Sequence, residues 1–208
     1  MNEQNMSNHK DLLENDIDPD PFVQFDRWFR EHLSSGVPIP DSVSFGSGFA
    51  GGRISVRMVL LKDYDGNGFV FFTNYNSRKG IQLASNPHGA LLFYLPEYAR
   101  QIRIEGTIEK VSAQESDDYF ATRPVESRIS AWASDQSSVI PDRDFLRKKY
   151  DFYRNMFSEK EVPRPEYWGG FRLVPDWFEF WQEGEFRLHD RLTYSRSNGI
   201  WIIKRLAP

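Results

Sequence analysis

The sequence predicts a mainly β fold with a few helices, arranged as an antiparallel β-barrel with helical elaborations. Short runs of β-branched and aromatic residues recur along the chain, and clusters of turn residues separate them. The Asn198-Gly199 pair near the end is typical of a two-residue hairpin turn. Aromatic residues are frequent, with 17 phenylalanines, 9 tyrosines and 6 tryptophans. That content favours a β-rich core or a site that holds flat ligands.

Alternation of apolar and polar residues marks the individual strands, most clearly from Arg100 to Val111. The glycine-rich segment 46–52 is expected to be a loop, because it lacks the spacing of the phosphate-binding glycine motifs. The expected strands span residues 43–45, 53–62, 69–73, 90–95, 100–111, 171–174, 178–181, 186–194 and 200–205.

Helix start signals stand between these strands. They are Asp20-Pro21, Ser77, the capping box formed by Ser112 and Glu115, and Asp142. Apolar residues at helical spacing predict that the first and the last of these helices pack on a core. Those residues are Phe22, Phe25, Trp28, Phe29 and Leu33 in the first helix, and Phe145, Leu146, Tyr150, Tyr153 and Phe157 in the last.

Composition excludes several classes of protein. The formal net charge of −4 and the lack of a basic stretch argue against nucleic-acid binding. The chain has no cysteine, which excludes disulfides and cysteine nucleophiles, and its four histidines lack metal-ligand spacing, so no metal is expected. No apolar run approaches the length of a membrane span, and the first residues lack the pattern of a leader. We therefore expect a soluble cytoplasmic protein without a membrane partner.

Two parts of unequal length are expected. Residues 1–20 are polar, with only Leu12, Leu13 and Ile17 to anchor them, and are expected to form a mobile arm. Residues 21–208 are expected to form a single domain, because no repeat, low-complexity tract or linker divides them.

Ser77-Arg78-Lys79 is a candidate phosphate site. A serine cap followed by two cations brings a hydroxyl, free backbone N–H groups and positive charge to one helix start. Cations in a first helical turn also oppose the helix dipole, so a purely structural role explains them poorly. From these residues alone both roles remain open.

Tyr119, Arg123 and Ser127 form a second candidate phosphate clasp. Tyr119 and Arg123 lie about one helical turn apart, and Ser127 follows shortly after. Two hydroxyls and a guanidinium suit a phosphate. The alternative, favoured without further support, is an arginine that binds the carbonyls of its own helix end. Arg57 and Lys62 fall on opposite faces of one expected strand, and each needs an anion or a carboxylate, which structural salt bridges could also supply.

The stretch 181–191 holds three cation-capable side chains, Arg187, His189 and Arg191. Read as a strand, it directs all three to one face. In an acidic chain that face suits an anionic planar ligand, with arginine as a rigid fork and histidine as a donor or acceptor near neutral pH. The alternative is a solvated edge strand, which this stretch taken alone favours.

Several motifs together carry a resemblance. In chain order they are residues 57–62, Ser77-Arg78-Lys79, Gln101, Arg123-Pro124, Gln136-Ser137-Ser138, Tyr167-Trp168-Gly169-Gly170, Glu179-Phe180-Trp181-Gln182, residues 187–191 and Arg205-Leu206-Ala207-Pro208. From about residue 21 to residue 208 the chain resembles the pyridoxamine (pyridoxine) 5′-phosphate oxidases, the FMN enzymes that make pyridoxal 5′-phosphate in vitamin B6 metabolism. Each motif alone is weak, but the set is specific.

The resemblance implies a split β-barrel that forms a homodimer with FMN at the dimer interface. The FMN contacts that it implies are Arg57, Met58, Val59, Leu60, Leu61, Lys62, Phe72, Thr73, Arg78, Lys79, Gln101, Gln136, Ser137, Trp181 and Arg191. The substrate contacts that it implies are Lys62, Tyr119, Arg123, Ser127, Arg187 and His189. Of these, Arg187 and His189 are given the catalytic role of fixing the pyridine ring and polarising its substituents.

The implied reaction is the oxidation of pyridoxamine 5′-phosphate and pyridoxine 5′-phosphate. A hydride leaves substrate C4′ for flavin N5, and O₂ reoxidises the flavin to give H₂O₂. Two alternatives stay open: a split-barrel flavin oxidoreductase with another substrate, and a non-catalytic FMN or pyridoxal-phosphate binding protein. The sequence departs from the family in the arm, because residues 1–20 contain neither the Arg nor the Tyr of the usual Arg-x-x-Tyr.

Overall fold

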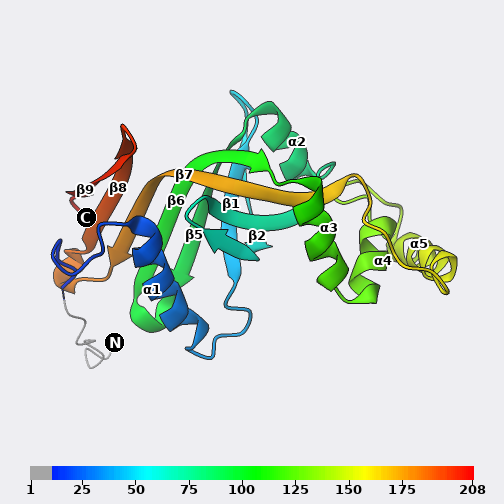
Figure 1. Ribbon diagram of the computed structural model, residues 1–208, viewed down its shortest axis with the longest axis horizontal. Coiled ribbons are helices and arrows are strands. Elements are labelled where there is room, and N and C mark those ends of the chain that lie inside the picture. Colours follow the sequence, from blue (N-terminus) through cyan, green and yellow to red (C-terminus); the bar gives the residue numbers. More distant parts are fainter. Residues whose placement is uncertain (1–10) are drawn as a thin grey trace.

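The computed structural model describes residues 11–208, which form antiparallel strands and a smaller number of helices (Figure 1). The predicted mainly β class is confirmed. The strands are β1 (Ser42–Gly48), β2 (Ile54–Leu60), β3 (Asp63–Asp65), β4 (Gly68–Asn74), β5 (His88–Leu95), β6 (Arg100–Lys110), β7 (Trp168–Gln182), β8 (Asp190–Ser197) and β9 (Ile200–Arg205). The helices are α1 (Pro21–Leu33), α2 (Arg78–Ser85), α3 (Ala113–Thr122), α4 (Val125–Ala133) and α5 (Arg143–Met156), with 3₁₀ turns η1 (Pro96–Tyr98) and η2 (Glu185–Arg187).

One antiparallel sheet contains all the strands of the described chain. Its order is β2-β1-β5-β6-β7-β4-β3, and β8 and β9 extend it from β7. The long strand β7 connects the two ends of the molecule, because its first residues pair with β4 and its last residues pair with β8. The backbone N–H of Lys62, just after β2, donates to the Val70 carbonyl of β4 at 2.9 Å. This bond extends the β3–β4 hairpin, in which Asp63 pairs with Val70. β2 and β4 lie near opposite ends of the strand order and yet contact each other, so the sheet is curled into a half-barrel.

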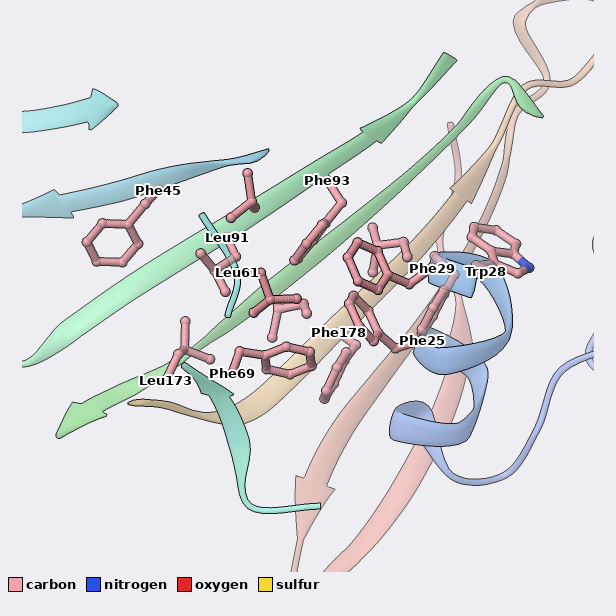
Figure 2. Close-up of a cluster of buried hydrophobic side chains, with 14 of the residues drawn as sticks. Phe25, Trp28, Phe29, Phe45, Leu61, Phe69, Leu91, Phe93, Leu173 and Phe178 are labelled. Atoms are coloured by element: carbon pink, nitrogen blue, oxygen red, sulfur yellow. The ribbon is translucent and has the colours of Figure 1, made fainter. Parts of the chain in front are cut away.

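The main core lies between the curled sheet and α1 (Figure 2). α1 begins as predicted, with the Asp20 side chain accepting a backbone hydrogen bond and proline at the first position. Phe25, Trp28 and Phe29 are buried, and burial stabilises the fold by roughly 1.5–3 kcal/mol for each large apolar side chain. Leu33, expected in the same stripe, is exposed because the helix ends there.

A second, smaller core cluster lies where α3, α4 and α5 meet the start of β7. Asp142 caps α5 as predicted. The expectation that all the apolar residues of α5 point inward is wrong for Phe145 and Leu146, which are exposed. α5 packs mainly on α4, so only one of its sides is covered within the chain, and Tyr150 and Tyr153 lie on that side.

The expected mobile arm is described only from residue 11, and residues 1–10 lie outside the described residues. The described part packs against the domain and does not extend away from it. Leu12 and Ile17 are 5% and 8% exposed and belong to the main core. The composition of the arm could not reveal this packing, because the side chains that bury Leu12 and Ile17 lie far away in the sequence.

Several strand and helix predictions need correction. The predicted loop 46–52 begins as strand, because β1 continues to Gly48 by pairing with β2 and with β5. The two strands expected near residues 171–181 are one strand, β7, which passes a bulge opposite Glu105 and Gly106. Helix α4 is absent from the sequence prediction, because Pro124 occupies its N-cap position without a capping side chain.

Candidate functional site

A pocket of about 540 Å³ opens between the end of β2, β4 and the helices α3 and α4. It brings together residues from two predicted groups, the FMN contacts and the substrate contacts. Its lining residues are Met58, Val59, Leu60, Lys62, Phe72, Thr73, Lys79, Tyr119, Arg123, Pro124, Ser127, Gln136 and Trp168. The volume is typical of a site for a small metabolite or part of a cofactor.

The start of α2 places a buried cation in this pocket. Ser77 caps the helix with its side chain, as predicted. Lys79 is 8% exposed, and its Nζ donates to Thr73 Oγ1 at 2.9 Å and lies 3.4 Å from Gln136 Oε1. Burial, followed by repulsion from Arg57, lowers the pKa of Lys79 to about 8. Because these acceptors are neutral, the ammonium lacks a counter-ion within the described chain.

Arg57 of β2 belongs to the same cluster of cations. Its guanidinium donates to Ser47 Oγ at 2.6 Å and to Gln82 Oε1 at 3.0 Å, and both acceptors are neutral. Burial, followed by repulsion from the exposed Arg78, lowers the pKa of Arg57. Arg57, Arg78 and Lys79 thus surround one helix start, and no carboxylate of residues 11–208 pairs with them. Residues 11–208 therefore leave the predicted need of Arg57 for an anion unmet.

Tyr119, Arg123 and Ser127 converge on the same pocket from α3 and α4. Arg123 is the C-cap of α3, and burial lowers the pKa of its guanidinium. Its Nη1 is buried without a hydrogen-bond partner in the described chain. The alternative of an arginine that satisfies helix-end carbonyls therefore finds no support at this nitrogen.

Other predicted residues lie around the pocket in different ways. Lys62 lines it and forms an ion pair with Asp41, with Nζ and Oδ2 2.6 Å apart. The side chain of Leu61 points instead into the main core. Ser137 follows Gln136 in an exposed loop and has a left-handed backbone (φ 75°).

The remaining predicted residues lie at the far end of β7. Gln101, Trp181 and Arg191 are neighbours across β6, β7 and β8. Arg191 donates to both carboxylate oxygens of the buried Glu179, at 2.9 and 3.0 Å, and these bonds raise the pKa of Arg191. The His189 ring packs on the Trp181 ring with centroids 4.7 Å apart.

The prediction that Arg187, His189 and Arg191 share one face of a strand is wrong. β8 begins only at Asp190, and the preceding η2 turn contains two residues with left-handed backbone, Phe186 (φ 55°) and Arg187 (φ 63°). Two consecutive residues in this region reverse the chain, so strand alternation cannot apply. Arg187 is exposed on the turn.

Gly184 holds this turn against His189. A Cβ at Gly184 would lie 2.1 Å from the Leu188 carbonyl oxygen, so only glycine fits. The Gly184 N–H donates to His189 Nδ1 at 3.2 Å. In the neutral imidazole the proton is therefore on Nε2, which is left as a donor.

Within one chain, the pocket residues and the predicted residues at the far end of β7 do not meet. Gly170, near the start of β7, pairs with Phe72 beside the pocket, whereas Trp181 lies eleven residues further along the same strand. At about 3.3 Å per residue, a strand of that length covers roughly 35 Å. Figure 1 shows β8 and β9 on the opposite side of the molecule from α3 and α4.

Sequence reasoning missed four residues of these sites. Trp168 and Pro124 line the pocket, Gln82 binds Arg57, and Glu179 binds Arg191. Trp168, Pro124 and Glu179 lie in motifs that carry the resemblance, which is the signal that could have found them, whereas Gln82 carries no sequence signal of its role. Among residues 11–208 there is no group of acidic or histidine side chains that could hold a metal ion, and no helix that could span a membrane.

Two family models together match most of the chain. The model described as pyridoxamine 5′-phosphate oxidase matches residues 37–157, and the model described as pyridoxine 5′-phosphate oxidase C-terminal dimerisation region matches residues 168–208. The pocket lies within the first match, apart from Trp168, and the far end of β7 lies within the second.

Curated proteins named pyridoxine/pyridoxamine 5′-phosphate oxidase are similar over nearly the whole length. The protein of Paraburkholderia phymatum is 54% identical over 194 residues, which cover 93% of this chain and 91% of the relative. The protein of Burkholderia vietnamiensis is 55% identical over 200 residues, with 95% and 93% covered. That of a Nostoc species is 48% identical over 198 residues, with 95% and 92% covered.

Solved structures share the fold. PhzG from Burkholderia lata, in complex with tetrahydrophenazine-1-carboxylic acid, has a TM-score of 0.88 at 30% identity, with 96% of this chain and all of that chain covered. A pyridoxamine 5′-phosphate oxidase-related, FMN-binding protein from Nostoc punctiforme has a TM-score of 0.71 at 16% identity, with 91% and 98% covered. These likenesses confirm the expected split-barrel class.

Proposed function

The chain belongs to the pyridoxamine 5′-phosphate oxidase family, and we propose that its active site is assembled from two copies of the chain. The reaction is the FMN-dependent oxidation of pyridoxamine 5′-phosphate and pyridoxine 5′-phosphate to pyridoxal 5′-phosphate. The observation that carries the two-copy proposal is the separation of the predicted contacts into two groups at opposite ends of β7. A homodimer, in keeping with the C-terminal dimerisation region, lets the far end of one chain meet the pocket of the other.

The surface beside the pocket supports this arrangement. Edge strand β2 exposes an apolar side chain at every second position, Ile54, Val56, Met58 and Leu60, with exposed fractions from 40% to 78%. An edge strand with such a stripe is an aggregation hazard unless another chain covers it. Met58 and Leu60 also line the pocket, so a second copy that covers the stripe also reaches the pocket.

The cation cluster at α2 fits the phosphate of FMN. Arg57, Arg78 and Lys79 lack a carboxylate partner in the described chain, and the helix start adds backbone N–H donors. Thr73 and Gln136 would complete the contacts, since both already lie at hydrogen-bond distance from Lys79. Bound FMN supplies the two-electron oxidation chemistry, and we propose O₂ as the final acceptor.

We place the phosphate of the substrate at Tyr119, Arg123 and Ser127, with Lys62 beside them. The unpartnered Nη1 of Arg123 supports this placement, because a buried guanidinium nitrogen without an acceptor is costly. The partner copy would then bring Arg187 and His189 to the pyridine ring. His189 would donate from Nε2 to a ring substituent, and it is not a base at Nδ1, because that atom already accepts from Gly184.

We also propose that residues 21–208 act as one FMN-binding domain in the cytoplasm. Two other functions are separable by experiment: a non-catalytic carrier of FMN or pyridoxal phosphate, and a flavin oxidoreductase of the same fold with another substrate.

The test is O₂ uptake by the purified FMN-loaded protein, with pyridoxamine 5′-phosphate, pyridoxine 5′-phosphate and unphosphorylated pyridoxamine as matched substrates. We expect turnover of the two phosphorylated compounds with formation of H₂O₂ and pyridoxal 5′-phosphate. Binding without turnover would identify a carrier. Equal turnover of the phosphorylated and unphosphorylated amine would contradict the assignment of Arg123.

A further inference from the structure

Trp168 lies under the guanidinium of Arg123. It opens β7, and only 7% of its surface is exposed. The Arg123 Cζ lies 4.6 Å from the centre of the Trp168 ring and 5.5 Å from that of Phe120. A guanidinium over an aromatic face is attracted by the ring quadrupole, and its N–H donors, which lie in its own plane, stay free for an anion.

A stack of rings holds Trp168 in turn. Its plane is within 12° of the Phe72 ring and within 5° of the Tyr119 ring, with centroids 5.6 and 6.2 Å away. Phe72 and Tyr119 stack on each other at 3.9 Å. At Gly170, which pairs with Phe72, a Cβ would lie 2.9 Å from the Phe72 ring, so the chain leaves room for this ring and no more. The stack leaves Trp168 little freedom to move.

Tyr119 interacts with Arg123 electrostatically, but no hydrogen bond between the two side chains orients the guanidinium. No hydrogen bond or ion pair among residues 11–208 fixes its side chain, and its Nη1 is buried without a partner. Burial lowers its pKa, which is the cost of a cation that awaits an anion. Aromatic packing is therefore what orients the guanidinium before the ligand arrives.

We propose that Trp168 is a positioning residue, which holds the Arg123 guanidinium with its donors toward the pocket and so sets the preference for phosphorylated substrates. The inference rests on the proposed function, in which Arg123 binds the substrate phosphate. Trp168 would act on binding, through Arg123, and leave the chemical step at the pyridine ring largely unchanged. Its loss should therefore appear in KM more than in kcat.

The experiment is a double-mutant cycle with Trp168→Met, which removes the ring, Arg123→Ala, and the combination of both. The readouts are KM and kcat for pyridoxamine 5′-phosphate, the flavin content, and the Kd of pyridoxal 5′-phosphate from its absorbance. Trp132→Met is the matched control, because Trp132 packs in the same cluster, against Tyr153 and Phe157, away from Arg123.

We expect Trp168→Met to raise KM and Kd about tenfold with kcat within about twofold, on the scale of a partly desolvated cation–π contact. Trp168→Phe, which keeps a ring, should stay within about threefold of wild type. The Trp132→Met control should leave both constants unchanged. Once Arg123 is absent, Trp168→Met should change Kd by less than about twofold, because the two residues act as one unit.

An equal loss from Trp168→Met with and without Arg123 would overturn the inference, since a residue that only packs acts independently of Arg123. If Trp168→Met does not fold, Trp168→Phe takes its place in the cycle. The expected coupling to Arg123 in Kd is then about two- to threefold, on the cation–π scale. The absence of this coupling would count against the proposal. Failure of the proposed function is a different result: wild-type protein would not oxidise pyridoxamine 5′-phosphate. The Kd cycle would still measure the coupling in that case.

Discussion

Lys79 donates a hydrogen bond to Thr73 across 2.9 Å, and this neutral hydroxyl stands where a buried ammonium would ordinarily have a carboxylate. The nearby Arg57 is likewise satisfied by neutral oxygens. Such a cluster is costly to the protein alone and becomes favourable once an anion binds.

FMN affinity is expected to fall as pH rises above about 8. In the FMN-free protein the pKa of Lys79 is about 8, and a phosphate prefers the protonated form. Above that pH, binding must first protonate Lys79, so affinity should fall by up to about tenfold per pH unit. Quenching of flavin fluorescence between about pH 6.5 and 9.5 measures this, over a window that brackets the shifted pKa. Lys79→Met should bind FMN weakly and without this dependence, whereas a flat wild-type profile would contradict the account.

Lys79 should also make the stability of the FMN-free protein depend on pH, and this dependence has the opposite sign to that of FMN affinity. Burial lowers the folded-state pKa of Lys79 below its usual 10.5, so the unfolded state binds more protons between about 8 and 10.5. The contribution of Lys79 to the free energy of unfolding of the FMN-free protein therefore rises with pH in that window.

Removal of residues 1–17 is expected to destabilise the fold. It deletes the buried Leu12 and Ile17, each worth roughly 1.5–3 kcal/mol of burial. It also removes the bond from the Leu12 N–H to Asp190 and the pair between Arg205 and Glu14, both 2.9 Å long. Thermal unfolding of the shortened and full-length proteins measures the loss. Removal of residues 1–10 alone is the control, and equal melting temperatures for all three proteins would show that the arm contributes nothing.

Gly169→Ala should lower the melting temperature. A Cβ at Gly169 would lie 2.2 Å from the Tyr75 hydroxyl and 2.8 Å from Ser116 Oγ, where α3 packs on β7. Overpacking of this kind costs about 1–3 kcal/mol, or roughly 2–4 °C for each kcal/mol in a chain of this size. Gly66→Ala is the matched control, because nothing lies within 4 Å of a Cβ there. Similar melting temperatures for the two variants would refute the close approach.

Arg187→Ala is expected to damage catalysis and not the fold. Arg187 is exposed on the η2 turn, so its loss leaves the core intact. If it fixes the pyridine ring, kcat/KM should fall about a hundredfold, or about 2.7 kcal/mol. Flavin content and melting temperature should stay at wild-type values. A variant that unfolds or loses FMN would mean that Arg187 holds the turn itself.

Local signals in the sequence predicted much of the fold and the pocket. The caps at Asp20, Ser77 and Asp142 work through neighbouring backbone groups, so a short window of sequence reveals them. Tyr119 and Arg123 do line one pocket as expected, although Arg123 is the extended C-cap of α3 and not a residue of the helix. These predictions needed no knowledge of distant parts of the chain.

Features that depend on tertiary contact escaped the sequence. The η2 turn reads as a strand because Phe186 and Arg187 give no sign of left-handed backbone in the sequence. The close approach of Gly184 to the Leu188 carbonyl is likewise visible only in the folded chain. Leu12 reads as part of a mobile arm because its partner Asp190 is remote in the sequence. The place of Trp168 under Arg123 depends on how β7 meets α3, which no local pattern encodes.

The central claim is that the pocket of one chain works with the η2 turn of another, and mixing two inactive variants tests it most directly. Arg123→Ala disables the pocket, and Arg187→Ala disables the turn. In a hybrid dimer of the two, one site would join the intact pocket to the intact turn. After the purified variants are unfolded and refolded together with FMN, random pairing should restore about a quarter of wild-type activity in a two-fold symmetric dimer. Activity no higher than that of the separate variants, despite hybrid dimers detected by differential tags, would contradict a shared site.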